Sequence, residues 1–120
     1  MSVSIIGGSV SPSTALSLNA QTGTTYTFVL TDANNTLVTA SNASAQTYTI
    51  PPNSSVAYPI GSQLNIIQIG AGQVSFAQGS GVTIASNGAT STAPKLRVQY
   101  SVASAIKVAT DTWYVVGDIV

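Results

Sequence analysis

Apolar residues alternate with small polar residues along most of the chain, and this period of two limits the fold more than any other feature. In the segment 24–31, Tyr26, Phe28 and Leu30 each follow a threonine or a valine. The segment 95–102, KLRVQYSV, repeats the pattern with Leu, Val, Tyr and Val. Successive side chains of a β-strand point to opposite faces, so both segments are predicted to be half-buried strands. The alternation is clearest in 95–102.

Clusters of turn-forming residues separate the alternating segments. They lie at 32–35, 41–44, 51–55, 70–72, 79–81 and 86–88, and each contains Gly, Pro or Asn. The segment 64–69, LNIIQI, is apolar on both faces and is predicted to be a central strand covered on both sides. No segment shows a helical period. The fold class expected is therefore all-β, either an antiparallel β-sandwich or a small jelly-roll-like barrel.

The chain has 120 residues, which suits a single domain. Residues 15–120 are expected to form the β-domain, preceded by an extended N-terminal arm at 1–14. The arm carries Val3, Ile5 and Ile6, which are costly to leave in water. Two interpretations stay open for it: a frayed terminus, or a strand that docks onto a neighbouring molecule. The first residues lack the basic and apolar regions of a signal peptide, so synthesis in the cytoplasm without export is expected.

Charged residues make up only 5% of the sequence, and the three acids balance the three bases. The chain has no histidine and no cysteine, which excludes the common zinc, haem, thiol and triad chemistries. We therefore expect no enzyme, no cofactor and no metal site. A neutral chain has no field to attract nucleic acid or an anionic membrane, and no apolar run is long enough to cross one. A net charge of zero favours association with other protein surfaces.

Two sequence patterns are similar to motifs with more specific meanings. GAGQVS at 70–75 is similar to a dinucleotide-binding glycine motif, but a strand pattern follows it where that motif needs a helix, so a hairpin turn is predicted. The tripeptide TYT occurs at 25–27 and at 47–49. Because the flanking residues of the two copies do not match, no internal repeat is inferred.

A small set of residues is predicted to contact partners. Lys95, Arg97 and Gln99 share one face of the predicted strand 95–102, where they form either a solvated edge or a polar row that meets a partner. Tyr58 stands between two proline-marked turns and is the best candidate for an exposed ring, while most other aromatic residues are expected in the core. Lys107 and Asp111 flank a predicted turn and could pair locally.

Three longer segments together resemble a small β-domain found in virion proteins of tailed bacteriophages. They are NAQTGTTYTFVLTD, PPNSSVAYPIGSQLNIIQIGAGQVSFAQGSGVTI and LRVQYSVASAIKVATDTWYVVGDI, and the resemblance covers about residues 15–120. It implies a structural role on the virion, usually as a trimer, with no catalytic residues to assign. Such domains occur at tail-fibre ends and as free-standing proteins on virion surfaces.

A short arm in place of a fibre shaft favours one member of that class. The expectation is a homotrimeric capsid decoration, or cement, protein on the outer surface of the phage head, with the major capsid protein as its partner. The alternative is a tail-fibre or spike tip that binds a receptor on the host surface.

Overall fold

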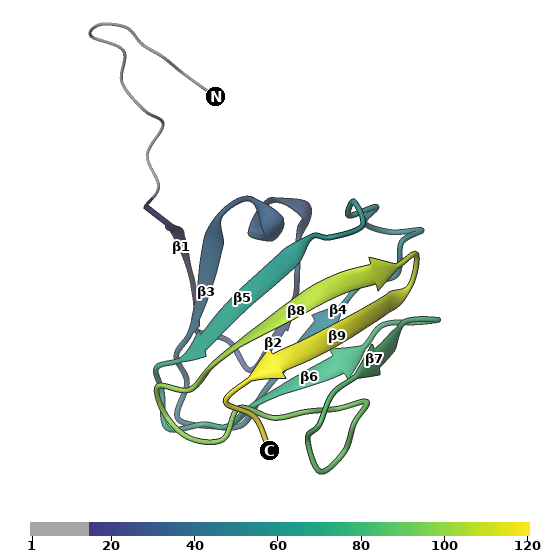
Figure 1. Cartoon of the computed structure of the whole chain (residues 1–120). Helices are drawn as coiled ribbons and strands as arrows, with labels where there is room; N and C mark the ends of the chain where they lie inside the picture. Colours follow the sequence, from purple (N-terminus) through teal and green to yellow (C-terminus); the bar gives the residue numbers. More distant parts are fainter. Residues whose placement is uncertain (1–14) are drawn as a thin grey trace, which may run out of the picture.

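The computed structural model describes residues 15–120 as an all-β unit with one short 3-10 helix (Figure 1). Its elements are β1 (Ser17–Gln21), β2 (Thr25–Thr27), η1 (Leu30–Ala33), β3 (Thr36–Ala40), β4 (Gln46–Ile50), β5 (Gln63–Gln68), β6 (Val74–Gln78), β7 (Thr83–Ala85), β8 (Val102–Ala109) and β9 (Thr112–Gly117). The strands form a six-stranded sheet in the order β1-β3-β5-β8-β9-β7 and a three-stranded sheet in the order β2-β4-β6. Within 15–120, no helix is long and apolar enough to span a membrane.

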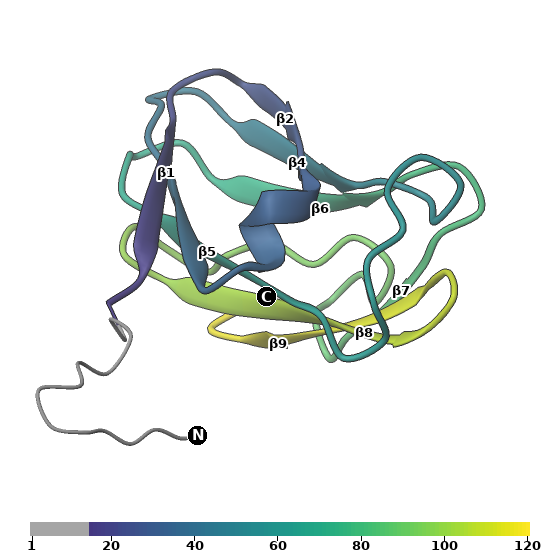
Figure 2. The same ribbon diagram turned by 90° about the horizontal axis from the view of Figure 1, so that it is seen from above.

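The first six strands alternate between the two sheets. β1, β3 and β5 enter the larger sheet, whereas β2, β4 and β6 enter the smaller one, so each consecutive pair makes one turn of a coil. Successive turns stack in parallel, and Figure 2 shows the two sheets on opposite sides of the interior. β8 and β9 then extend the larger sheet by antiparallel pairing, and β7 closes its edge beside β9.

Aromatic and branched side chains fill the space between the sheets. Phe28, Tyr48 and Phe76 are buried, with the rings of Phe28 and Phe76 stacked at a centroid distance of 6.3 Å. Trp113 enters from β9 and meets the ring of Tyr58 edge-on at 5.3 Å. The inward positions of the strands are apolar because burial of such side chains is the main gain in folding free energy.

The prediction of an antiparallel fold was wrong. In the part of the chain that the structure describes, five strand pairings are parallel and two are antiparallel. Period-two alternation reports which face a side chain occupies, but it carries no information on the direction of the neighbouring strand. The predicted all-β class is confirmed.

Two predictions about single segments were also wrong. Residues 95–101 form an irregular segment with only isolated bridges at Lys95 and Leu96, and β8 starts at Val102. β5 is central, but its burial alternates, so only one of its faces is covered.

The glycine motif at 70–72 is not a hairpin but the corner where the chain passes from β5 to β6. A Cβ on Gly72 would lie 1.8 Å from the Ser44 carbonyl oxygen, so glycine is required for the close approach of two stacked corners.

Candidate interaction surface

The solvent side of the six-stranded sheet carries no charged side chain at the strand positions set by its register. We call this surface the outer face. It consists of three rows across the sheet, namely Leu18, Leu37, Asn65, Ser104 and Val116, then Ala20, Thr39, Ile67 and Val102, then Gln63, Ile106, Tyr114 and Ala85. Large apolar residues therefore lie on every strand of the sheet except β7.

Several apolar side chains of the outer face are well exposed. Leu18 is 70% exposed at the β1 edge, and Tyr114 and Val116 are each 51% exposed on β9. Beside β9, residues Tyr114, Val116 and Ala85 contribute to a hollow of about 410 Å³. Several exposed apolar side chains gathered on one face are typical of protein interaction surfaces.

The polar groups of the outer face bond to one another. Gln63 Nε2 donates to Asn65 Oδ1 at 2.8 Å and to Ser104 Oγ at 3.2 Å. Ser104 Oγ donates to the same Asn65 oxygen at 2.7 Å, and Asn65 Nδ2 donates to the Thr36 carbonyl at 3.2 Å. Because these groups already have partners in the chain, covering them with another protein would cost little desolvation free energy.

The solvent side of the three-stranded sheet differs in chemistry. Its register places Thr25, Thr47 and Ser75 in one row and Thr27, Thr49 and Ala77 in the next. These side chains are small and mostly hydroxylated. The two sides of the molecule thus present one uncharged surface with several large exposed apolar side chains and one surface of short polar side chains.

The residues predicted as a contact row, Lys95, Arg97 and Gln99, are all exposed but do not share a strand face. Arg97 Nε and Nη2 donate to the two carboxylate oxygens of Asp118 at 2.7 and 3.0 Å. This guanidinium, together with the Ser101 hydroxyl, lowers the pKa of Asp118, and the carboxylate raises the pKa of Arg97. Gln99 Nε2 donates to the Ile69 carbonyl at 3.0 Å. The side chains of Arg97 and Gln99 therefore secure this irregular segment.

Tyr100, which the sequence did not mark as a contact residue, is the exposed aromatic residue of the same segment. Its ring is 67% exposed, and its φ of +71° lies in the left-handed region that disfavours a bulky side chain. The Tyr100 amide donates to the Gln68 carbonyl, and the Gln68 amide donates to the Ser101 carbonyl, so pairing with the end of β5 holds the unusual backbone. No sequence signal marks this conformation, because the alternation predicted an extended backbone here.

Tyr58, predicted to be exposed, is buried. Its exposure is 2%, its hydroxyl donates to the Val29 carbonyl at 2.7 Å, and its ring packs on Trp113. Residues of the turns on both sides of Tyr58, at 54–55 and 59–61, are exposed, whereas its own side chain enters the core, a direction that the turn residues in the sequence do not reveal. Val3, Ile5 and Ile6 lie outside the described residues, so their predicted role in contacts stays a prediction.

Lys107 and Asp111 do not pair with each other but hold the same asparagine. Lys107 is buried, and its Nζ donates to Asn53 Oδ1 at 2.7 Å and to the Tyr58 carbonyl at 2.8 Å. The Asn53 amide donates to Asp111 Oδ1 at 2.8 Å. The two charged residues thereby fasten the loop between β4 and β5 to β8 and the turn after it.

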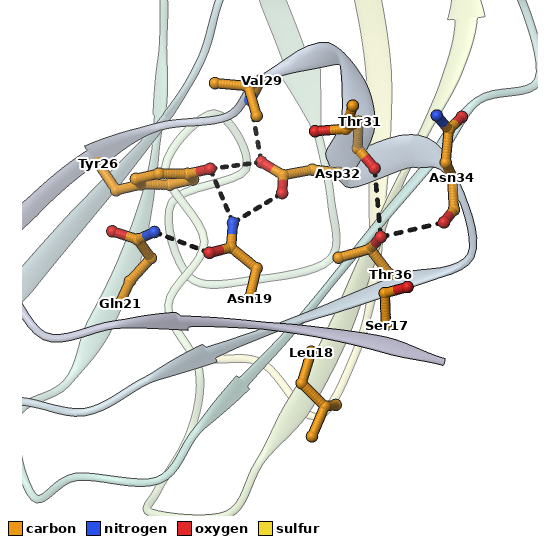
Figure 3. Close-up of a pocket in the computed structure, with 10 residues that line it drawn as sticks. All are labelled: Ser17, Leu18, Asn19, Gln21, Tyr26, Val29, Thr31, Asp32, Asn34 and Thr36. Carbon is orange, nitrogen blue, oxygen red and sulfur yellow. Dashed lines mark hydrogen bonds between the residues drawn. The ribbon is translucent and has the colours of Figure 1, made fainter. Parts of the chain in front are cut away.

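A polar cavity of about 630 Å³ opens between β1, β2 and η1, and Figure 3 shows the residues that line it. Asp32 lies at its centre, buried, and accepts hydrogen bonds from Asn19 Nδ2, the Tyr26 hydroxyl and the Val29 amide at 2.8, 2.7 and 2.9 Å. Burial and the bond to Asp32 raise the pKa of Tyr26 to about 12. The carboxylate therefore holds η1 against the first turn of the coil.

Comparisons of the chain with protein-family models, with curated proteins and with solved structures gave no match.

Proposed function

We propose that this protein is a structural component of a tailed-bacteriophage virion, a homotrimeric decoration protein that binds the outer capsid shell between capsomers and stabilises the head. One observation carries the proposal. Five of the six charged side chains of the sequence bond to other parts of the same chain, namely Asp32, Arg97, Lys107, Asp111 and Asp118. The few charges thus serve to hold loops and turns, which supports a structural role.

The distribution of these bonds supports the same role. Asp32 fastens η1 to β1 and β2, Lys107 and Asp111 fasten the loop that contains Asn53, and Arg97 joins the irregular segment to the chain end at Asp118. Apart from the bond between Tyr26 and Asp32, each of these bonds joins residues 13 or more positions apart in the sequence, so local opening at these positions is resisted. A protein that reinforces a shell benefits from loops held in this way.

The architecture adds to the proposal. We infer that the two sheets form a sandwich built from stacked turns, the compact arrangement implied by the resemblance to phage virion domains. An outer surface of large apolar side chains without charge suits the broad interfaces of permanent assemblies, which resemble a domain core cut in half. The uncharged outer face is of this kind.

Fractionation of virions that carry the protein tests the proposal. Heads and tails are separated and the protein is measured in each by mass spectrometry; we expect it with the heads. Heads stripped of the protein should rebind the purified chain and should open at a higher temperature afterwards. Recovery with the tails would overturn the proposal and favour the receptor-binding tip, and rebinding without any gain in head stability would overturn the stabilising role.

A further inference from the structure

We infer that the outer face of the six-stranded sheet packs against the outer faces of other copies of this chain, which meet around the three-fold axis of the proposed homotrimer. The inference rests on the proposed homo-oligomer and names the surface that forms it. It does not require a position on the phage head.

The absence of charge on the outer face favours an uncharged partner surface. A partner surface that carries Lys, Arg, Asp or Glu would lose the hydration of those groups without gaining an opposite charge, which is costly on burial. An uncharged surface avoids that cost. A second outer face meets the requirement, because its rows combine aliphatic side chains with Gln63, Asn65 and Ser104, whose polar groups already bond to one another.

The outer face approaches the size of a protein interface. Six strands spaced about 4.8 Å apart and about five residues long cover roughly 500 Å² in plan. Side chains that project from the sheet add accessible area to this plan value, and a standard interface takes ~800 Å² from each partner. Most of the outer face would therefore be covered in the assembly, and it has no charge to oppose its burial.

The shape of the outer face also favours contact between copies of the chain. Leu18 projects at the β1 edge of the sheet, and the hollow beside Tyr114 and Val116 lies towards the opposite edge. In a trimer whose outer faces point towards the three-fold axis, the β1 edge of one copy lies next to the β7 edge of its neighbour, so the projection of one copy can enter the hollow of the next.

Charge substitutions on the outer face test the inference, with light scattering as the measurement of mass. Val102→Lys and Val116→Lys each place a cation on an exposed outer-face position of an inner strand. Thr47→Lys is the matched control, since it adds the same charge at an exposed position of the central strand of the other sheet. We expect a mass of three times 12.1 kDa for the unmodified chain and the control, and a shift to 12.1 kDa for both outer-face variants.

A third variant guards against a lysine that simply disrupts folding. Tyr114→Ser removes an exposed ring without adding charge and should weaken assembly at least tenfold, while the circular dichroism spectrum stays that of the folded, unmodified chain. An unmodified chain that is monomeric, or outer-face variants that keep the oligomeric mass, would overturn the inference.

The two proposals fail in different experiments. A dimer that the outer-face variants dissociate would support the outer face and overturn the trimer of the proposed function. Loss of the protein from the head fraction would overturn the virion role and leave the mass measurements unaffected.

Discussion

Tyr26 and Tyr48 lie directly beside each other on neighbouring parallel strands, with ring centroids 5.6 Å apart. Their flanking threonines are paired as well, Thr25 with Thr47 and Thr27 with Thr49. The two TYT tripeptides are therefore equivalent positions in successive turns of the coil. The next turn places Phe76 beside Tyr48, so a ladder of aromatic rings crosses the three-stranded sheet.

The tyrosines of this ladder predict a loss of stability in alkali. Burial raises the pKa of Tyr48 to about 12, and burial together with Asp32 does the same for Tyr26, against an ordinary value of 10.0. The folded state therefore favours the neutral phenols, and this contribution is complete below pH 10 and lost as the pH rises through about 12. Urea midpoints should hold from pH 7 to 9.5 and fall between pH 10 and 12.

Tyr48→Phe is the control for the alkaline prediction, because it keeps the ring and removes the ionising group. The variant should unfold with a weaker dependence on pH, and the rise in tyrosinate absorbance near 295 nm that accompanies unfolding should be smaller than in the unmodified chain, because Tyr26 still contributes to it. A urea midpoint that is constant up to pH 12 would contradict the prediction.

The sequence predicted the all-β class and placed most turns because both depend on local chemistry. Gly, Pro and Asn at 41–44, 51–55 and 70–72 do lie at connections between strands. The stacking of turns was missed although the TYT copies indicated it. Their connections differ in length, because β1 pairs with β3 at a separation of 19 residues and β3 with β5 at 28, so the flanking residues do not align.

The candidate surface was predicted less well than the fold, because its residues come together only through strand order. Leu18, Asn65 and Val116 belong to one row although 98 positions separate the first from the last. The alternation at 95–102 was misleading for a different reason. Leu96 is buried as expected, but the bond between Arg97 and Asp118 and the left-handed Tyr100 take the place of a regular strand.

Removing the charge of Asp32 should destabilise the fold. In Asp32→Asn, the side-chain nitrogen that replaces one carboxylate oxygen would face donors, since Asn19, Tyr26 and the Val29 amide all donate to this side chain. An unsatisfied buried group costs about 1–3 kcal/mol of unfolding free energy. Asp111→Asn is the matched control, because it keeps the one oxygen that accepts from the Asn53 amide. Equal urea midpoints for the two variants would contradict the role assigned to Asp32.

The corner at Gly72 should tolerate no side chain. A Cβ there would overlap the Ser44 carbonyl, so Gly72→Ala must push two stacked turns apart, and overpacking of this kind costs about 1–3 kcal/mol or more. In contrast, a Cβ on Gly23 would have its nearest contact at 3.6 Å, and Gly23→Ala should change the unfolding free energy by less than about 0.5 kcal/mol. Thermal melts of both variants measure the difference, and a folded Gly72→Ala with an unchanged melting temperature would show that the corners are not tightly stacked.

Tyr100 offers the opposite case, a position where glycine should stabilise the fold. The left-handed conformation at φ +71° costs a bulky residue about 1–2 kcal/mol, and the ring, being 67% exposed, returns little burial. Tyr100→Gly should therefore raise the unfolding free energy by about 1 kcal/mol, after allowance for the greater freedom of glycine in the unfolded chain. Urea denaturation measures this gain.

Tyr100 lies two residues before Val102 of the outer face. If the strained ring is kept because it contacts a partner, removing it should weaken partner binding. A variant that is both less stable and equally assembled would mean that the backbone at Tyr100 is not strained and that the ring makes no contact.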